Sequence, residues 1–495
     1  MSTFRSVNPA RPDDVVGEYP AHGPAEVDAA VERAAAAQRD WAARPAPARA
    51  DVIAAAGAVI ARDKDALTAL VSREAGKVLV EAGGDVQEAV DMAAFVAGQG
   101  RSAWGDTVPS ELGDKLCWTT RQPVGVVGMI TPWNFPVAIP SWKVFPALLA
   151  GNGIVIKPSE HAPACCEAFV AACVEAGVPA DLIQVVHGYA EPAAALAVHP
   201  GVGALGFTGS VPTGRIVAAA AMESGPRLLS LELGGKNAMV VRADADLDLA
   251  VDGAVFGAFG TSGQRCTSTS RLITHPDVAG ELVDRIVKRA GELRLGDPQD
   301  PAIDVGPVIT GSSAERIAAT VAAAVDEGAT VAAGGQAVTV DGCDGGAFFA
   351  PTVLTGVQPD HRIARDEVFG PVLAVLEVAD LDEALAVVNS VEYGLSAAVY
   401  TRDINAALRA VDRIDTGIVY VNAPTIGAEV PLPFGGTKHT GNGFREAGAR
   451  GIEQFSQLKT VYVDYSGRLQ KAQIDTHPLD RGEGGTAAPA AAVRS

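Results

Sequence analysis

The sequence predicts an α/β fold with two doubly wound sheets, and two observations indicate it. Short runs rich in β-branched residues alternate with helical stretches of ten or more residues, which is typical of parallel strands joined by crossover helices. The alternation occurs twice, once before and once after the glycine-rich segment 260–267. A chain of 495 residues, 48% of them hydrophobic, has the material for two or three packed domains.

The elements follow in order along the chain. Residues 25–100 are alanine-rich, with apolar residues recurring every three or four positions, so we expect helices that pack on a sheet. A first series of strands is expected at residues 124–130, 153–156, 182–186, 204–208 and 238–241. A second series is expected at residues 270–274, 330–333, 372–378, 397–401 and 418–421. The two α/β domains are expected to meet near residues 232–235.

Two further strands, at residues 116–121 and 460–465, stand apart from both series. They are expected to pair outside the main sheets, in a small arm. After Ile474 the chain continues into a tail rich in Gly, Ala, Pro and Ser, which has too little apolar surface to form a core and is expected to be loose.

Charge and cysteine content narrow the functional class. The 39 basic and 59 acidic residues give a net charge of −20, which argues against a nucleic acid or an anionic membrane as partner and favours a small-molecule substrate. No apolar run is long enough to cross a membrane, and the six cysteines lack the spacing of a disulfide framework or a metal site. We therefore expect reduced thiols in a cytoplasmic protein, with Cys165 and Cys166 buried in a helix.

Two segments are candidates for binding the phosphates of a dinucleotide. Residues 201–206 match the pattern G-x-G-x-x-G, but these glycines lead into a strand instead of opening a helix, which argues against a phosphate site. Residues 207–215 leave a strand and enter a helix, with Gly209 and Ser210 at its start, and suit a pyrophosphate better. A plain N-capped turn remains the alternative for this second segment.

A charged pair follows the strand expected at residues 153–156. Lys157 and Glu160 stand at its carboxyl end, where open α/β sheets bind ligands. Such a pair can hold a ribose diol, and the carboxylate would repel a 2′-phosphate, so NAD is favoured over NADP. A surface ion pair is the alternative interpretation.

Three residue types that serve acyl chemistry occur in suggestive surroundings. Cys266 follows a loop of small residues, with Arg265 beside it to favour the thiolate that attacks a carbonyl. Glu232 could be a general base for hydrolysis of a thioester, and Asn134, in a loop fixed by two prolines, could donate to an oxyanion. The alternatives are an inert core cysteine, a carboxylate paired with Lys236 and an asparagine in a local turn.

Taken in order, these segments resemble the aldehyde dehydrogenase superfamily from about Asn8 to Asp464. The motifs that carry the resemblance are TPWNFP (131–136), KPSE (157–160), FTGS (207–210), LELGGKN (231–237), GQRCT (263–267), EVFGPVL (367–373) and PFGGTKHTGNGFRE (433–446). The match is highly specific and covers nearly the whole chain. One departure is the loop 187–191, which lacks the second glycine usual in relatives.

The resemblance implies a role for each of several residues. Cys266 would be the nucleophile, Glu232 the base for deacylation, and Asn134 with the Cys266 backbone N–H the oxyanion hole. Lys143 and Glu446 would link the base to solvent. NAD, with NADP as the alternative, would be bound by Thr131, Trp133, Lys157, Ser159, Glu160, Gly209, Ser210, Glu367 and Phe369. No metal ion is implied.

The resemblance also implies domain limits and an oligomer. A Rossmann-like cofactor domain would comprise residues 1–112 and 130–233, an oligomerisation arm residues 113–129 and 455–475, and a catalytic domain residues 234–454, followed by the loose tail at 476–495. The arm would join subunits into a homodimer or a homotetramer.

The implied reaction is oxidation of an aldehyde to a carboxylate through a thiohemiacetal and a thioester on Cys266. Because Glu232 is present, hydrolysis is expected in preference to transfer to coenzyme A, and the intact site argues against a non-catalytic homologue. A resemblance to the branch that oxidises aminoadipate semialdehyde rests on Arg265, Gly427, Ala428 and Glu88 as substrate-binding residues. Other motifs resemble the mainstream of the superfamily. Both an amino-acid or other carboxylate-bearing semialdehyde and a broad range of aliphatic aldehydes therefore remain open as substrates.

Overall fold

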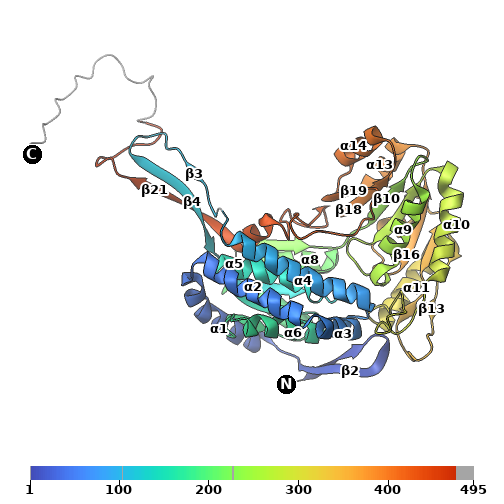
Figure 1. The fold of residues 1–495 in the computed structure, drawn as a ribbon, viewed down its shortest axis with the longest axis horizontal. Helices are drawn as coiled ribbons and strands as arrows, with labels where there is room; N and C mark the ends of the chain where they lie inside the picture. Colours follow the sequence, from blue (N-terminus) through green and yellow to red (C-terminus); the bar gives the residue numbers. More distant parts are fainter. Residues whose placement is uncertain (1, 103, 226–227, 475–495) are drawn as a thin grey trace, which may run out of the picture. The chain divides into compact units, whose positions relative to one another are not determined.

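The computed structural model describes residues 2–102, 104–225 and 228–474, and the tail expected at residues 476–495 lies outside them. The chain divides into two compact units. The larger comprises residues up to 101 together with 123–456, and the smaller comprises residues 102–122 and those from 457 onward. Figure 1 shows their helices and strands.

The larger unit contains a five-stranded parallel sheet in the order β7-β6-β5-β8-β9. Its strands are β5 (Val126–Thr131), β6 (Gly153–Pro158), β7 (Ile183–Val185), β8 (Val202–Thr208) and β9 (Leu228–Glu232). Every residue of β5 and β6 is buried, as in parallel strands that are covered on both faces. The strand order reverses between β5 and β8, so the carboxyl ends of these two strands border a crevice of the kind that binds ligands.

Helices cover this sheet. They are α1 (Pro24–Ala43), α2 (Ala46–Arg62), α3 (Lys64–Ala75), α4 (Leu79–Gln99), α5 (Ala138–Ala150), α6 (Pro163–Glu175), α7 (Ala190–Val198) and α8 (Val211–Glu223). Val27 and Val31 of α1 pack with Val126 of β5 in one apolar cluster, while α5 contacts β5 and β6. The helical stretch expected at 25–100 is confirmed as α1 to α4, and Cys165 and Cys166 are buried and free in α6, as expected.

The larger unit also contains a seven-stranded sheet in the order β12-β15-β16-β11-β10-β18-β19. Its strands are β10 (Asn237–Val241), β11 (Thr269–Thr274), β12 (Thr330–Ala333), β15 (Thr352–Thr355), β16 (Val372–Glu377), β18 (Ser396–Tyr400) and β19 (Ile418–Val421). All neighbours are parallel except β12 and β15. The helices are α9 (Leu247–Phe259), α10 (Pro276–Glu292), α11 (Gly311–Asp326), α12 (Arg362–Arg365), α13 (Leu381–Asn389) and α14 (Ile404–Arg413).

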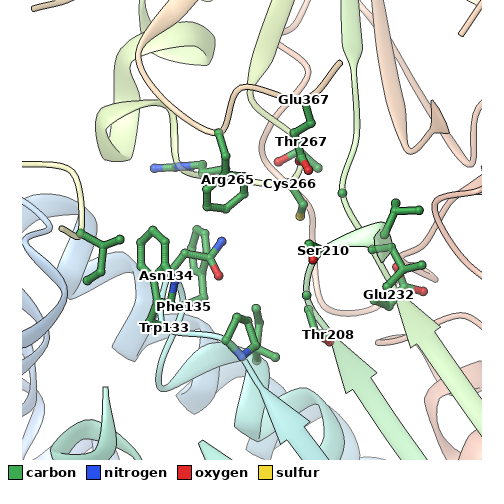
Figure 2. Close-up of a pocket in the computed structure, with 18 of the residues that line it drawn as sticks. Trp133, Asn134, Phe135, Thr208, Ser210, Glu232, Arg265, Cys266, Thr267 and Glu367 are labelled. Carbon is green, nitrogen blue, oxygen red and sulfur yellow. The ribbon is translucent and has the colours of Figure 1, made fainter. Parts of the chain in front are cut away.

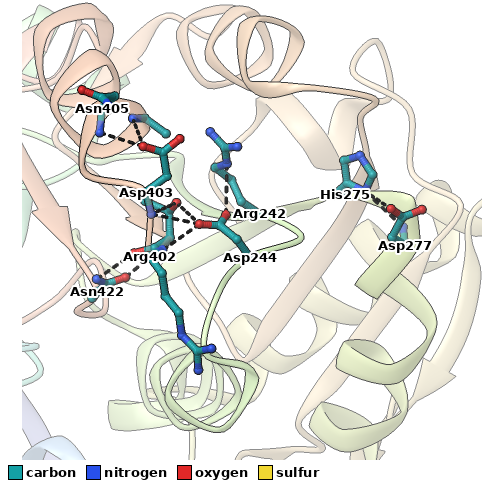
Figure 3. Close-up of polar contacts among 10 residues, drawn as sticks. Arg242, Asp244, His275, Asp277, Arg402, Asp403, Asn405 and Asn422 are labelled. Carbon is teal, nitrogen blue, oxygen red and sulfur yellow. Dashed lines mark hydrogen bonds and ion pairs between the residues drawn. The ribbon is translucent and has the colours of Figure 1, made fainter.

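Alternation along β10 shows that helices pack on both faces of the seven-stranded sheet. Met239 and Val241 join a cluster with α9 and α10, whereas Ala238 and Val240 join another with α11 and α13. Polar contacts fix the connections at the carboxyl ends of its strands (Figure 3). The Asp244 carboxylate accepts from the backbone N–H groups of Arg402 and Asp403.

The prediction that residues 238–241 belong to the first sheet was wrong. This strand is β10, which lies between β11 and β18 in the second sheet. The fifth strand of the first sheet is instead β9, which ends at Glu232. Both segments are apolar and buried, and nothing in their composition indicates which sheet each one joins. The chain crosses from one sheet to the other between Glu232 and Asn237.

Several short elements were not predicted. The N-terminus forms an antiparallel hairpin of β1 (Thr3–Asn8) and β2 (Arg11–Pro20), and β15 was also missed. Two small antiparallel pairs are β13 (Ala337–Val338) with β14 (Phe348–Phe349) and β17 (Tyr393–Gly394) with β20 (Thr437–Lys438). Two 3₁₀ helices are η1 (Gly260–Gly263) and η2 (Ala449–Phe455).

The smaller unit is built on a three-stranded sheet in the order β21-β4-β3. Its strands are β3 (Thr107–Val108), β4 (Lys115–Pro123) and β21 (Ser456–Asp464). The two strands expected outside the main sheets therefore do pair with each other. β5 begins at Val126, inside the segment 113–129 that was assigned to the arm, so residues 126–129 lie in the five-stranded sheet. Among the described residues, no helix combines the length and apolar character of a membrane span.

Candidate active site

A cleft of about 830 Å³ lies between the two sheets of the larger unit. The first sheet contributes the loops that follow β5 and β8 and the end of β9, including Asn134, Ser210 and Glu232. The second half contributes the loop after η1, the start of α11 and the loop before β16, including Cys266 and Glu367. Figure 2 shows these side chains around one cavity. The cleft is thus lined by the carboxyl ends of strands of the first sheet and by segments at the amino ends of β11 and β16 of the second sheet.

The loop that carries Cys266 is held in an unusual conformation. Thr261 and Ser262 have φ angles of 52° and 53°, in the left-handed region that residues other than glycine rarely adopt. Gly263 also has a positive φ of 68°, and a Cβ there would lie 2.1 Å from the carbonyl oxygen of Gly370. This position therefore requires glycine. The tight turn places Cys266 directly after it, half-buried in the cleft.

The Cys266 thiol is protonated in the resting site. Burial raises its pKa well above the ordinary value, and the carboxyl groups of Glu232, Glu367 and Glu446 raise it further. The backbone N–H of Thr267 donates to the sulfur and acts in the opposite direction. The side chain of Arg265, which was expected to favour the thiolate, donates to Thr261 Oγ1 and Glu81.

Glu232 is the last residue of β9, and its carboxyl group is buried in the cleft. Neither carboxyl oxygen has a hydrogen-bond partner among the described residues, and no ion pair there joins it to Lys236. Burial raises the pKa of Glu232 far above its usual range, the Glu446 carboxylate adds to this, and Lys143 and Arg445 oppose it. The carboxyl group is therefore neutral at rest. It can act as a base only after it has lost its proton, which alkaline pH favours.

Lys143 and Glu446 form a buried ion pair behind Glu232. Lys143 lies on α5, in the first half of the unit, and Glu446 follows the second sheet. Of the two, Glu446 lines the cleft and Lys143 does not. The pair thus extends from the cleft wall into the protein. It lies beside the Glu232 carboxyl group, which has no hydrogen-bond partner among the described residues.

Asn134 links the two halves of the cleft. Its side chain is buried, and Nδ2 donates to the carbonyl oxygen of Gln264 at 3.0 Å. This contact crosses to the loop of Cys266, so the alternative of a local turn is not what the structure has. An amide nitrogen carries two hydrogens, and the second remains available to a ligand oxygen in the cleft.

The start of α8 suits the pyrophosphate of a dinucleotide. Ser210 is the N-cap, and its Oγ accepts from Thr213 N–H at 3.4 Å, so the capped turn expected as an alternative is present. Gly209, Ser210 and the first residues of α8 line the cleft, and Thr208 Oγ1 is buried without a partner among the described residues. A helix N-terminus and an unbonded hydroxyl facing a cavity both favour a bound phosphate group.

Glu367 and Phe369 form the opposite wall of this part of the cleft. The Gly235 N–H donates to Glu367 Oε1 at 3.1 Å, and a Cβ on Gly234 would lie 2.0 Å from the same carboxyl group. The glycine pair thus allows Glu367 to approach the backbone. Burial raises the pKa of Glu367 to about 7. Phe369 and Trp133 meet edge to face at 5.7 Å, and both line the cleft.

The remaining expected cofactor residues do not line this cleft. Thr131, Lys157, Ser159 and Glu160 are absent from its wall, whereas the next residue, His161, is part of it. Lys157 is buried and pairs with Glu160 at 3.6 Å, so the alternative of a surface ion pair does not describe it well. The ribose contacts expected from this segment stay predictions.

All four residues expected to bind the substrate line the same cleft: Arg265, Glu88, Gly427 and Ala428. Arg265 pairs with Glu81 at 3.3 Å and lies 5.5 Å from the ring centre of Phe135. Burial raises the pKa of Glu88 to about 8, with a further increase from Asp85, so this carboxyl group is mainly neutral at pH 7.

The start of α11 also belongs to the wall, although the sequence did not indicate it. Thr310 caps this helix, and Ser312, Ser313 and Arg316 line the cleft with it. Arg316 Nη1 donates to the Val368 carbonyl oxygen at 2.6 Å, beside Glu367. The run Thr310-Gly-Ser-Ser before a helical stretch was a visible N-cap signal, but nothing in it indicates that the helix begins at the cleft.

Comparison with known proteins identifies the family of the chain. The sequence model of the aldehyde dehydrogenase family matches residues 1–461. An alpha-ketoglutarate semialdehyde dehydrogenase of Haloferax volcanii is 40% identical over 465 residues, 94% of this chain and 96% of that protein. An alpha-ketoglutaric semialdehyde dehydrogenase of Bacillus subtilis is 36% identical, over 92% of this chain and 93% of that protein.

Solved structures are similar over the same extent. A putative aldehyde dehydrogenase from Burkholderia cenocepacia superposes with a TM-score of 0.92 at 35% identity, covering 95% of this chain and 96% of that one. A betaine aldehyde dehydrogenase from Staphylococcus aureus in complex with NAD⁺ gives a TM-score of 0.91 at 31% identity, covering 94% and 93%.

The fold and the cleft define an α/β oxidoreductase of the dinucleotide-binding type. The chain belongs to the aldehyde dehydrogenase family. The resemblance seen in its motifs is thereby confirmed, as are the two α/β halves, the action on small-molecule aldehydes and the use of NAD. The assignments of individual site residues and of the domain limits stay predictions.

Proposed function

We propose that this enzyme oxidises a carboxylate-bearing aldehyde to the acid by covalent catalysis at Cys266. One observation carries the proposal: a thiol, a carboxamide and a buried carboxyl group face the same cleft, and the carboxyl group has no hydrogen-bond partner in the described part of the chain. A thiol nucleophile divides the reaction into acylation and hydrolysis, and the carboxyl group serves the second step.

In the first step the Cys266 thiol gives its proton to water, and the sulfur attacks the aldehyde carbon. The oxygen of the resulting thiohemiacetal becomes an anion, to which Asn134 Nδ2 and the Cys266 backbone N–H donate. When bound, the nicotinamide cofactor accepts the hydride that leaves this carbon. Cys266 then carries the acyl group as a thioester.

In the second step Glu232 takes a proton from water, and the hydroxide attacks the thioester. The carboxylate product leaves, and the Cys266 sulfur regains a proton. Glu446 and Lys143, next to Glu232, provide a path along which that proton moves away. Transfer of the acyl group to coenzyme A would not need such a base, which is why hydrolysis is the preferred outcome.

The cofactor is held by groups from both halves. The N-terminus of α8 with Ser210 would bind the pyrophosphate, Glu367 and Phe369 the nicotinamide ribose, and Trp133 the adenosine side. We further propose that Lys157 and Glu160 set a preference for NAD over NADP, because a second negative charge at the ribose would meet the Glu160 carboxylate.

The substrate proposed is the semialdehyde of a 2-oxo dicarboxylic acid. Two relatives that match over nine-tenths of the chain are named for alpha-ketoglutarate semialdehyde. Arg265 and the Gly427–Ala428 backbone would hold the distant carboxylate. A neutral Glu88 donates to a 2-oxo group, whereas a 2-ammonium group would require its charged form. The amino-acid semialdehyde is therefore the second candidate substrate, and aliphatic aldehydes are the third.

A substrate panel tests the proposal. The semialdehydes of 2-oxoglutarate, aminoadipate and succinate and a plain aliphatic aldehyde are assayed with NAD and with NADP, each with and without coenzyme A. We expect the highest kcat/KM for the 2-oxoglutarate compound with NAD, and free acid formed at full rate without coenzyme A. A higher kcat/KM for the aliphatic aldehyde would contradict the substrate assignment, and a requirement for coenzyme A would contradict the mechanism.

A homodimer or homotetramer is proposed for the assembly. The sheet β21-β4-β3 has edge strands that another subunit can extend by main-chain hydrogen bonds. Light scattering on protein that elutes from a size-exclusion column measures the mass of the assembly directly. The mass of a monomer would contradict the proposal.

A further inference from the structure

Five ionisable side chains form a cluster beside the substrate end of the cleft, of which two are fully buried and three partly buried. Glu81, Asp85 and Glu88 belong to α4 and are spaced so that they share one face of the helix. Lys77 precedes α4, and Arg265 comes from the loop of Cys266. Two ion pairs join members of this group, Lys77 with Asp85 and Arg265 with Glu81, and neither involves the reacting atoms. The mechanism above uses neither Glu81 nor Asp85.

Glu81 holds the loop that carries the nucleophile. Its Oε1 accepts from Thr261 N–H at 2.8 Å and from Arg265 Nη2 at 3.3 Å. Arg265 Nε in turn donates to Thr261 Oγ1 at 2.8 Å, which closes a ring of three residues. Thr261 opens the left-handed turn that leads to Cys266, so one carboxylate stabilises a backbone conformation that is otherwise unfavourable.

Asp85 holds the loop that carries the carboxamide. Its Oδ1 accepts from Ala138 N–H, at the start of α5, at 2.7 Å, and its Oδ2 accepts from Lys77 Nζ at 3.0 Å. The Lys77 ammonium lies 3.5 Å from the ring centre of Phe135, the residue after Asn134. The Lys77 and Asp85 side chains are only 1% and 0% exposed, so water does not compete for the contacts that they make.

The cluster is electrically balanced. Burial raises the pKa of Glu88 to about 8, which leaves it mainly neutral at pH 7. Lys77 and Arg265 then face the carboxylates of Asp85 and Glu81. Burial lowers the pKa of Lys77, and the adjacent Asp85 carboxylate opposes this effect. A buried set of charges without a surplus can be rigid, whereas removing a single member would leave an uncompensated charge in the interior.

We propose that Glu81 and Asp85, one turn apart on α4, are positioning residues that hold the Cys266 loop and the Asn134 loop in register across the cleft. The inference rests on the proposed function, because it gives these residues work only if Cys266 and Asn134 carry the reaction. The two loops come from different sheets, and α4 is a rigid element to which both are bonded.

The Asp85 half of the proposal is tested with a charge-neutral replacement, Lys77→Met combined with Asp85→Leu. This pair removes the acceptor of Ala138 N–H and the ammonium at the Phe135 ring, and it leaves no unpaired charge in the interior. We expect the rate of the first NADH turnover, measured by stopped flow, to fall at least tenfold. The dissociation constant for NAD, measured by fluorescence titration, should stay within twofold. Asp91→Asn, an exposed carboxylate on the same helix, is the matched control and should match the wild type.

A double-mutant cycle separates positioning from a general structural effect. In an Asn134→Ala background the same replacement should slow the first turnover less than twofold further, because it acts through the missing amide. A tenfold loss in both backgrounds would overturn the inference. A wild-type first turnover in Asn134→Ala alone would instead overturn the proposed role of Asn134, and so the two failures are distinguishable.

The Glu81 half is tested by the reactivity of the Cys266 thiol toward iodoacetamide, followed by mass spectrometry of the peptide that contains it. Glu81→Ala should slow labelling at least fivefold, whereas Glu81→Gln, whose amide oxygen can still accept from Thr261 N–H, should stay within twofold of the wild type. If Glu81→Ala does not fold, Glu81→Asp withdraws the carboxylate by one methylene and carries the same expectation. Equal labelling rates in all variants would overturn this half.

Discussion

The two ends of the cleft are suited to their ligands by different groups, backbone amides at one end and ionisable side chains at the other. At the cofactor end, the main features are the N-terminus of α8 behind Ser210 and a backbone amide, Gly235 N–H, which fixes Glu367. At the reaction end, burial and neighbouring carboxyl groups raise the pKa values of Glu232 and Cys266, so that each holds its proton more tightly than it would in water. Backbone binding tolerates changes of single side chains, whereas chemistry that depends on buried ionisable groups does not.

The largest effect is expected for the nucleophile. Cys266→Ser should lower NADH production at least about 10³-fold, because a hydroxyl is a far weaker nucleophile without a dedicated base beside it. NAD binding, measured by fluorescence titration, should stay within twofold, because the cofactor end does not depend on this side chain. A variant that retained a tenth of the activity would contradict the distinction between the two ends.

The next effect is expected for the base. Glu232→Gln should reduce the steady-state rate by roughly 10²–10³-fold, the usual range for loss of a general base. The wild-type rate should rise with pH, because the raised pKa of Glu232 keeps its basic form scarce near neutrality. The glutamine variant has no such group, so its residual rate should lose that rise. A parallel pH profile in both proteins would assign the titration to another residue.

A smaller effect is expected on the stability of the folded protein when Glu88, at the substrate end of the cleft, is replaced. The unfolded chain ionises Glu88 near pH 4.5, while the folded protein holds that proton up to about pH 8, so folding binds a proton across this window. Stability contributed by the neutral form is complete below pH 4.5 and declines as pH rises toward 8. Glu88→Gln should therefore be more stable than the wild type at pH 8, by roughly 1–3 kcal/mol, and no more stable near pH 4.5. Thermal unfolding at both pH values measures this, and a constant difference would contradict it.

The smallest effect is expected at the cofactor end. Ser210→Ala removes the cap of α8 and should weaken NAD binding by roughly fivefold, which corresponds to about 1 kcal/mol for a lost N-cap. The rate at saturating NAD should stay near the wild-type value, because the backbone N–H groups of the helix remain. A loss of kcat as large as that in Glu232→Gln would mean that the two ends are not independent.

Sequence patterns were sufficient for the α/β class, for most strands and for the groups that meet in the cleft. Cys266, Glu232 and Asn134 were singled out by their local settings and given roles by the family resemblance. The structure places all three at the cleft, and their roles stay predictions. The assignment of β10 to the first sheet failed because β9 and β10 are both short and apolar, and partner choice between sheets depends on contacts distant in sequence.

The contacts that hold the Cys266 loop and the Asn134 loop could not be predicted from the sequence, for a related reason. Glu81 and Asp85 lie in an amphipathic helix, where carboxylates at that spacing usually form a solvated face. Nothing local indicates that this face is covered by the loops of Cys266 and Asn134. Likewise, Arg265 was expected to act on the thiol and the substrate, and its pairing with Glu81 is visible only after folding.

The most direct test of the account is to trap the acyl group. Glu232→Gln is mixed with NAD and the semialdehyde, quenched in acid and digested, and the peptide containing Cys266 is weighed by mass spectrometry. We predict that this peptide gains the mass of the acyl group in nearly every molecule, and that the added mass is absent when Cys266→Ser is combined with it. An unmodified Cys266 peptide after one equivalent of NADH has formed would contradict covalent catalysis at this thiol.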